Sequence, residues 1–311
     1  MIFNKPKFWD KKKPNFFAIL LFPFSKIVTL ISNLKSGENF KNSNIKTICV
    51  GNIYVGGTGK TPLSIKINNM LNEKKFKSVV AKKFYNEQKD EQILIKNKTN
   101  LITKGSRKDC LNEAIKQNFQ IVVFDDGLQD KSISYDIKIC CFSSNTWIGN
   151  GWVIPAGPLR ENIYSLKKFD IVFLNGADIN NEEKREQIFK INKNIKIYES
   201  NYKLKALDKF DISQNYVAFS GIGNPENFNL TLKENNFKIL KSFSFPDHYD
   251  YNKKDINVIK KFADKNKAKI ITTEKDYLRI KKEFRNDIRF IEMELEIHNE
   301  TEFNNLILDK K

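Results

Sequence analysis

Short, uninterrupted apolar runs recur along this chain, and several of them are separated by stretches with helical periodicity. Apolar runs rich in β-branched residues are typical of buried strands. A first series of strands is predicted at 45–50, 78–81, 120–124, 137–142 and 170–174, with helices at 61–73 and 108–117. Strands that alternate with helices indicate a mainly parallel, doubly wound sheet.

A second, shorter series of the same kind follows. Its predicted strands lie at 216–220, 238–243, 268–272 and 288–293, and its predicted helices at 225–234 and 253–264. We therefore predict an N-terminal segment (1–40), a main α/β domain (41–205) and a smaller C-terminal α/β domain (206–311). A chain of 311 residues is long enough for two domains of this type.

The N-terminal segment combines lysines with an apolar, phenylalanine-rich run. Lysines at positions 5, 7, 11, 12 and 13 precede Phe16, and the apolar stretch continues less purely to Leu34. No small-residue cleavage site follows, so this is not a signal peptide, and Pro23 with several polar residues weakens it as a full membrane span. An amphipathic helix on an anionic membrane surface fits better, and a helix packed on the main domain is the alternative.

Charge and composition narrow the classes of partner and of chemistry. With 54 Lys and Arg against 37 Asp and Glu, the formal charge is +17, which favours an anionic partner: nucleic acid, a phosphorylated small molecule or an acidic membrane. The 4 cysteines show no C-x-x-C spacing and indicate core packing in a reducing compartment. Only 2 histidines are present, so magnesium on oxygen ligands is a better expectation than zinc.

The sequence from Val50 to Pro62, VGNIYVGGTGKTP, has the form of a phosphate-binding loop between a strand and a helix. Its glycines permit positive φ angles that bring N–H groups close to phosphate oxygens, and Lys60 supplies an ammonium for the outer phosphates. Tyr54 stands where the common pattern has its first glycine. The predicted nucleotide-binding residues are Gly56, Gly57, Thr58, Gly59, Lys60 and Thr61.

Four further motifs carry candidate chemistry. The strand at 120–124 ends in D-D-G-L-Q, where a nucleotide-binding sheet places the acid that orients magnesium, and one of Asp125 and Asp126 is expected to reach the metal. P-A-G-P-L-R-E (155–161) places a cation beside an anion, F-P-D-H (245–248) holds one of the two histidines, and T-E-K-D (273–276) ends a predicted strand.

Taken together with G-I-G-N-P-x-x-F (221–228), these motifs resemble the tetraacyldisaccharide 4′-kinase family, the lipid A 4′-kinases, in order from about residue 50 to residue 276. The resemblance implies a phosphate-loop NTPase-like α/β core flanked by helices, a smaller second α/β lobe and an N-terminal hydrophobic helix. It implies a kinase that uses ATP and Mg²⁺ to phosphorylate the 4′-hydroxyl of a tetraacyldisaccharide 1-phosphate, giving lipid IV-A at the cytoplasmic face of the bacterial inner membrane.

The resemblance also assigns roles to residues. Lys89-Asp90-Glu91 is the nearest match to the family's G-D-E segment, which makes Asp90 the candidate base and His248 its partner. Two positions depart from the family pattern: Lys89 replaces its glycine, and Asp130 replaces the histidine that follows D-D-G-x-Q. The implied catalytic residues are Lys60, Asp90 and His248; the implied metal ligands are Thr61, Asp125, Asp126 and Glu161; the implied substrate residues are Arg107, Gln129 and Arg160.

The expected partners are the lipid substrate and an anionic membrane surface, with no nucleic acid and no obligate protein partner. The main alternative is a membrane-associated phosphate-loop ATPase of the partitioning or targeting class. Val55 in place of that class's lysine argues against it, as do the P-A-G-P-L-R-E and F-P-D-H motifs. A nucleic-acid-binding ATPase would cluster lysines with stacking aromatics, whereas here aromatics concentrate in the N-terminal segment.

Overall fold

The computed structural model describes residues 5–34, 40, 44–176 and 181–309, and within them the chain forms two compact units. The larger unit comprises residues 5–84, 98–201 and 297–311, and the smaller unit comprises 85–97 and 202–296. The predicted ranges 41–205 and 206–311 are continuous in sequence. The structure instead assigns 85–97 to the smaller unit and 297–311 to the larger.

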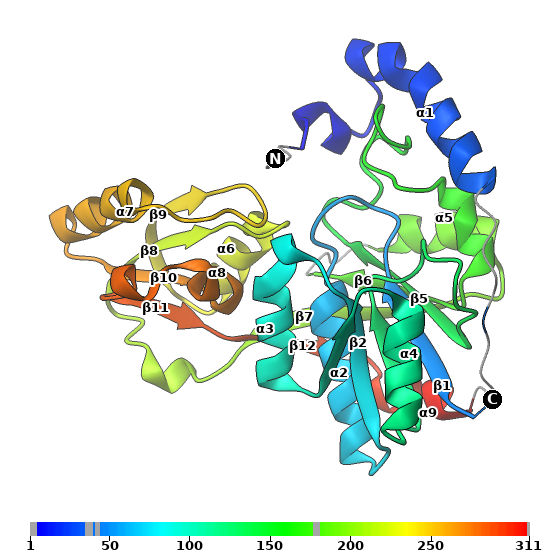
Figure 1. The fold of residues 1–311 in the computed structure, drawn as a ribbon. Helices are drawn as coiled ribbons and strands as arrows, with labels where there is room; N and C mark the ends of the chain where they lie inside the picture. Colours follow the sequence, from blue (N-terminus) through cyan, green and yellow to red (C-terminus); the bar gives the residue numbers. More distant parts are fainter. Residues whose placement is uncertain (1–4, 35–39, 41–43, 177–180, 310–311) are drawn as a thin grey trace. The chain divides into compact units, whose positions relative to one another are not determined.

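The larger of the two sheets has eight strands, and β1 to β7 pair with one another in parallel (Figure 1). β1 is central, between β4 and β5. The strands in spatial order are β12 (Met293–Ile297), β7 (Lys196–Leu204), β6 (Ile171–Asn175), β5 (Ile137–Ser143), β1 (Lys46–Gly51), β4 (Ile121–Asp125), β2 (Ser78–Lys83) and β3 (Leu101–Lys104).

Helices cover both faces of this sheet, which explains why its strands are continuous apolar runs. Alternate residues of β6 show the arrangement: Val172 and Leu174 pack with Ile188 of α5, whereas Phe173 packs on Phe303 of α9. This packing places the C-terminal helix in the larger unit. The helices are α1 (Phe16–Leu34), α2 (Lys60–Glu73), α4 (Arg107–Lys116), α5 (Glu182–Ile191) and α9 (Glu300–Asp309), with 3₁₀ turns at Lys7–Asp10 and Ile163–Lys168.

The smaller unit has a four-stranded parallel sheet in the order β11-β10-β8-β9. Successive residues of β8 point to opposite faces: Val217 packs in a core with Ile256 of α7, and Ala218 in a core with Phe228 of α6. The strands are β8 (Asn215–Ser220), β9 (Lys238–Ser244), β10 (Lys269–Thr273) and β11 (Ile288–Ile291). The helices are α3 (Lys89–Lys98), α6 (Pro225–Glu234), α7 (Lys253–Lys265) and α8 (Glu274–Arg279), with 3₁₀ turns at Asn86–Gln88, Leu207–Lys209 and Lys282–Phe284.

The predicted mainly parallel sheets flanked by helices are confirmed, but the sequence pattern missed several elements. The segment from Lys82 to Thr103, which had no predicted element, contains α3 and β3. The single strand predicted at 288–293 is two strands, because the chain leaves the smaller sheet after Ile291 and enters the larger sheet at Met293. An apolar run is continuous across such a change of sheet, so its hydrophobicity does not reveal the break.

The N-terminal segment contains α1, a helix that leaves much of its apolar surface in contact with solvent. The side chains of Phe16, Leu20 and Leu30 are 75%, 62% and 60% exposed. Ala18 and Ser25 are buried on the opposite side. Among the described residues, no helix has the length and apolarity needed to cross a membrane.

Candidate active site

The glycine-rich loop follows the central strand β1 and ends at the start of α2. Gly56 and Gly59 have φ angles of 140° and 82°, in a range that residues with side chains rarely adopt. Gly59 directly precedes α2, so Lys60 and Thr61 are the first residues of that helix. Loop N–H groups and the positive end of a helix together favour an anion at this position.

Two buried asparagines that the sequence analysis did not single out as site residues hold this loop. Nδ2 of Asn52 donates to Oγ1 of Thr58 at 2.8 Å and to the carbonyl oxygen of Tyr54 at 2.6 Å. Nδ2 of Asn175, the last residue of β6, donates to the carbonyl oxygen of Thr58 at 2.5 Å. In the sequence, Asn175 directly follows the predicted strand at 170–174, and this position was a signal for it.

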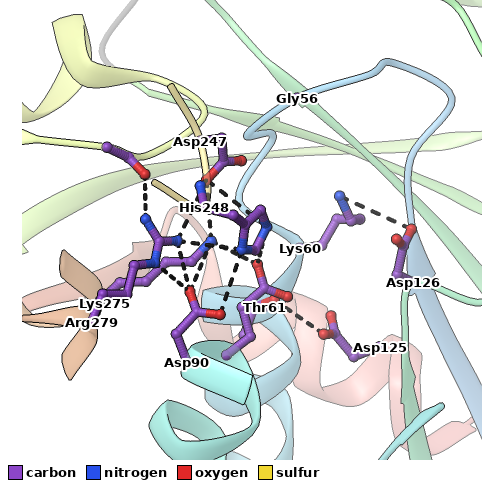
Figure 2. A network of polar contacts seen from close by, with 12 residues as sticks. Gly56, Lys60, Thr61, Asp90, Asp125, Asp126, Asp247, His248, Lys275 and Arg279 are labelled. Carbon is purple, nitrogen blue, oxygen red and sulfur yellow. Dashed lines mark hydrogen bonds and ion pairs between the residues drawn. The ribbon is translucent and has the colours of Figure 1, made fainter. Parts of the chain in front are cut away.

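Asp125 ends β4, beside the loop, because β4 pairs with β1 and Asp125 is in register with Val50. Its carboxylate is fully buried and accepts from Oγ1 of Thr61 at 3.0 Å and from Oγ of Ser64 at 3.1 Å. Nζ of Lys82, itself 3% exposed, lies 2.6 Å from Oδ2. Asp125 therefore joins the first turn of α2 to the end of β2, and Figure 2 shows its contact with Thr61.

Asp126 turns away from the strand, with a φ angle of 58°. Its carboxylate lies 3.0 Å from Nη1 of Arg160 and 4.0 Å from Nζ of Lys60 (Figure 2 shows the second contact). Burial raises the pKa of Asp126, but the positive charges of Lys60, Arg160 and other nearby cations outweigh burial and lower it to about 2. Asp126 is therefore ionised at neutral pH and faces the same side as the loop lysine.

The predicted residues Gln129 and Glu161 join this group. Nε2 of Gln129 donates to Oε1 of Glu161 at 3.0 Å and to the carbonyl oxygen of Asn52 at 2.9 Å. Nη1 of Arg160 donates to Oε1 of Gln129 at 3.3 Å. The D-D-G-L-Q and P-A-G-P-L-R-E motifs, which are separate in sequence, thus contact each other and the base of the phosphate loop.

Arg107 lies at the start of α4 and is buried. Its Nη2 donates to the carbonyl oxygen of Asp126, and its Nη1 lies 2.9 Å from Oδ2 of Asp130. Asp130, which stands where the family pattern has a histidine, is thus the ion-pair partner of a predicted substrate residue. Burial lowers the pKa of Arg107, but the net shift is upward because of nearby Tyr135 and Asp130, so the guanidinium stays charged.

The smaller unit brings together the other two predicted catalytic residues. Asp90, near the start of α3, is 8% exposed, and its Oδ1 lies 3.5 Å from Nδ1 of His248 (Figure 2). Arg279 of α8 contacts the other oxygen, Oδ2, through Nη2 at 2.7 Å and Nε at 2.8 Å. The two oxygens of Asp90 therefore have different partners: one faces the histidine, and one is fixed by the arginine.

A second layer of charges surrounds this pair. Nζ of Lys275 lies 2.7 Å from Oε1 of Glu91 and 3.4 Å from Oδ1 of Asp247. Burial raises the pKa of Asp90, but the hydrogen bond with His248 and the charges of Lys275 and Arg279 together lower it to about 2. Asp90 is thus a buried carboxylate that stays ionised throughout the neutral range.

Arg279 is a residue that the sequence analysis missed. Its Nη1 contacts Asp276 at 3.2 Å, and Asp276 is fully buried and also accepts from Tyr251 Oη and the Gly221 amide, both at 2.9 Å. Thr273 caps the short helix α8, which projects Lys275 and Arg279 to the same carboxylates. The T-E-K-D motif indicated the start of this helix. The residues around Arg279 do not indicate which carboxylate it binds.

The predicted site residues thus form two groups. Lys60, Thr61, Asp125, Asp126, Gln129, Arg160, Glu161 and Arg107 lie in the larger unit, and Asp90 and His248 lie in the smaller unit. Within the described residues, no group of three or more His, Cys, Asp and Glu side chains has the arrangement of a metal site.

Comparison with known proteins gave matches along nearly the whole chain. Residues 17–311 match the family profile described as "LpxK: Tetraacyldisaccharide-1-P 4'-kinase". A protein of Pelagibacter ubique (strain HTCC1062) named tetraacyldisaccharide 4'-kinase is 49% identical over 308 residues, which cover 99% of this chain and 98% of that protein. A protein of the same name from Rickettsia bellii (strain OSU 85-389) is 35% identical over 295 residues, covering 88% and 89%.

A solved structure is similar as well. The crystal structure of the "apo" form of LpxK from Aquifex aeolicus in complex with ATP matches with a TM-score of 0.69, covering 94% of this chain and 98% of that one. The two sequences are 20% identical in this comparison. At that level of identity, the similarity establishes a shared fold.

Proposed function

The chain belongs to the tetraacyldisaccharide-1-P 4'-kinase family, and from this premise we propose how its charged residues transfer a phosphoryl group from ATP to the 4′-hydroxyl of a tetraacyldisaccharide 1-phosphate. The enzyme is a lipid A 4′-kinase, and its product is lipid IV-A. The observation that best supports the chemistry is the contact between Thr61, at the end of the phosphate loop, and the buried Asp125. Family membership does not favour the alternative of a partitioning ATPase.

In our proposal the larger unit binds ATP. The N–H groups of Gly56 to Thr61 hold the phosphates, and the ammonium of Lys60 stabilises the charge that develops on the transferred group. Arg160, which is held beside Asp126, adds a second cation. Electrostatic stabilisation of this kind is the main contribution a protein makes to phosphoryl transfer, because little covalent chemistry is required of it.

The residues present fit a bound magnesium ion. Thr61 supplies a hydroxyl and Asp125 and Asp126 supply carboxylates, which are the oxygen donors that magnesium prefers, and Glu161 is a further carboxylate near Gln129. We propose that Thr61 and one of the two aspartates hold the ion, with Glu161 contributing through water. When bound, magnesium neutralises charge on the phosphate oxygens.

We propose that Asp90 removes the proton from the 4′-hydroxyl while the oxygen attacks the γ-phosphorus. The new P–O bond forms as the bond to the β-phosphate oxygen breaks, and ADP leaves with its electron pair. A carboxylate with a pKa of about 2 is a weak base, so it needs a group that takes the proton onward. The His248 ring, 3.5 Å from Oδ1 of Asp90, supports that role for the histidine.

Three residues are proposed to bind the acceptor. Gln129 and Arg160 contact each other beside the phosphate loop and offer an amide and a guanidinium to hydroxyl or phosphate groups of the disaccharide. Arg107 is buried between Asp130 and the Asp126 carbonyl, so its contacts support an indirect role through the shape of that turn.

The N-terminal segment is proposed to hold the enzyme at the cytoplasmic face of the bacterial inner membrane. The apolar side chains of α1 are exposed along one side, and lysines precede the helix. An amphipathic helix of this kind lies in the interface with its apolar face in the acyl boundary and its lysines near anionic headgroups. The enzyme would then reach its lipid substrate while that lipid stays in the bilayer.

The proposal is tested by incubating the protein with labelled ATP, magnesium and tetraacyldisaccharide 1-phosphate in detergent. We expect a doubly phosphorylated lipid, and we expect Lys60→Ala to abolish its formation. Absence of transfer by the wild-type protein, together with ATP hydrolysis stimulated by another protein or by DNA, would refute the kinase assignment.

A further inference from the structure

The N-terminal helix α1 is seated on the larger unit by one narrow face. The residues of this face are spaced three and four apart, as residues on one side of a helix are. Those that are buried or half-buried are Ala18, Leu21, Phe22, Ser25, Val28 and Thr29. In Figure 1 the chain after β5, drawn in green, reaches up to this N-terminal part, drawn in dark blue.

Ser25 makes the polar contact at the centre of this face. Its side chain is 3% exposed, and Oγ donates to the carbonyl oxygen of Val153 at 2.7 Å and accepts from the amide of Ala156 at 3.1 Å. One turn earlier, the ring of Phe22 lies 4.5 Å from that of Trp152. The helix therefore fixes the backbone of residues 152–160, which we call the strap.

The strap in turn holds the beginning of the phosphate loop. The carbonyl oxygen of Pro158 accepts from the amide of Val55 at 2.8 Å, and the amide of Arg160 donates to the carbonyl oxygen of Ile53 at 2.6 Å. These two bonds lie on either side of Tyr54 in sequence. The path of the loop before its first glycine is thus set by the strap, which is set by α1.

Tyr54 links the loop to the N-terminal segment by a second route. Its ring packs with Val153 and Leu159, and its hydroxyl donates to Asp10, with Nζ of Lys5 at 3.0 Å. A Cβ at Gly56 would lie 3.4 Å from the Tyr54 ring, so the loop passes directly over it. The residue that departs from the common phosphate-loop pattern is therefore the one that binds residues 5–10.

We propose that residues 5–29 are a structural support of the phosphate loop, with Ser25 and Tyr54 as its positioning residues, so that the helix with the exposed apolar face also sets the affinity for ATP. This inference rests on the proposed ATP site. Loss of the Ser25 hydroxyl removes the acceptor of the Ala156 amide and leaves the Val153 carbonyl with the Gly157 amide, at 3.1 Å, as its remaining donor. The strap then shifts to satisfy the Ala156 amide. Val55 and Ile53 follow the strap, and the loop N–H groups lose their alignment with the phosphates.

The test compares two variants of the full-length protein in detergent, Ser25→Ala and Tyr54→Phe, neither of which changes a residue of the proposed ATP site, Gly56 to Thr61. We expect each to raise the KM for ATP about tenfold while leaving the KM for the lipid acceptor within twofold of wild type. Ser165→Ala is the matched control, because Ser165 is buried in the same unit and its Oγ has no hydrogen-bond partner among the described residues. It should leave both constants unchanged.

The inference is overturned if Ser25→Ala and Tyr54→Phe both bind ATP as tightly as wild type, or if they change both KM values equally, as general destabilisation would. If Ser25→Ala does not fold, Tyr54→Phe and Asp10→Asn decide the question alone. Restored ATP affinity in Ser25→Thr, which keeps the hydroxyl, would support the proposal. Failure of the wild-type protein itself to bind ATP would instead refute the proposed function.

Discussion

Replacing Arg279 with methionine is the sharpest test of how this protein keeps Asp90 charged. Arg279 is the cation closest to Asp90, with Nη2 at 2.7 Å, whereas Nζ of Lys275 lies at 3.9 Å. The pKa of Asp90 is lowered from 3.8 to about 2. At 1.36 kcal/mol per pKa unit, this corresponds to roughly 2.5 kcal/mol in favour of the ionised form.

The sign of the effect follows from the depressed pKa. Asp90 contributes stability that is fully present above its ordinary pKa of 3.8 and is lost as the pH falls toward 2. Without Arg279, burial still raises the pKa of Asp90 and less charge opposes it, so the pKa rises. The variant should therefore lose part of this contribution, and Asp276 should also lose its partner at 3.2 Å. Removing one partner of a buried pair costs about 3–5 kcal/mol.

Two assays measure these effects. Urea unfolding at pH 7 should give a free energy of unfolding about 3 kcal/mol lower for Arg279→Met than for wild type. Kinase turnover measured between pH 4 and pH 8 should show an acidic limb that wild type lacks in this range. Arg279→Lys should behave more like wild type, and Arg289→Met, which removes an exposed arginine of the same unit, should change neither quantity.

Unchanged stability together with an unchanged pH profile in Arg279→Met would refute the reasoning from geometry. A large loss of stability with no new acidic limb would show that the ion pair between Arg279 and Asp90 stabilises the fold. It would also show that Asp90 is not the base.

Three further predictions follow from the same structure. Asp90→Ala should reduce kcat by about 10²–10⁴-fold, the usual contribution of a general base, while the Kd for ATP measured by calorimetry stays near wild type; wild-type turnover would move the base elsewhere. Lys82→Met should lower the free energy of unfolding in urea by about 3 kcal/mol, because Asp125 is fully buried and keeps only hydroxyl partners. A change below about 1 kcal/mol would mean that the ion pair between Lys82 and Asp125 is not desolvated in solution. Phe24→Asp, on the exposed side of α1, should weaken partition into anionic vesicles at least tenfold without changing the melting temperature, since transfer of one phenylalanine side chain out of water contributes about 1.5–3 kcal/mol. Partition equal to that of wild type would exclude this face of α1 as the membrane contact.

The glycine-rich loop and the elements on either side of it were predictable because each of these parts is local in sequence. The glycines, Lys60 and Thr61 are consecutive, and the strand before them and the helix after them follow from adjacent patterns. Asp125 was found for a related reason, since a carboxylate directly after a buried strand lies at the same sheet edge as the loop. Lys82 is also at the end of a strand, but a lysine in a lysine-rich chain carries no comparable signal.

The contact between Asp90 and His248 was predictable only through the family resemblance. Asp90 and His248 are far apart in sequence, and neither lies in a pattern that predicts their contact. The surrounding Lys275 and Arg279 lie on α8, a helix too short for hydrophobic periodicity to reveal. Their arrangement depends on α3 and the β8–β11 sheet belonging to the same unit although they are far apart in sequence, which no local pattern encodes.

The sequence by itself determined many of the strands and helices, the parallel sheets and the glycine-rich loop, because periodicity, glycine and charge act over a few residues. Tertiary structure alone decided which unit each segment joins, as with residues 85–97 and α9, and which oxygen of Asp90 faces the histidine. It also gave Tyr54 its role, since the residue that looked irregular in the loop pattern binds residues brought from the N-terminus. Such contacts join positions distant in sequence, and their free energy depends on burial and geometry that exist only after folding.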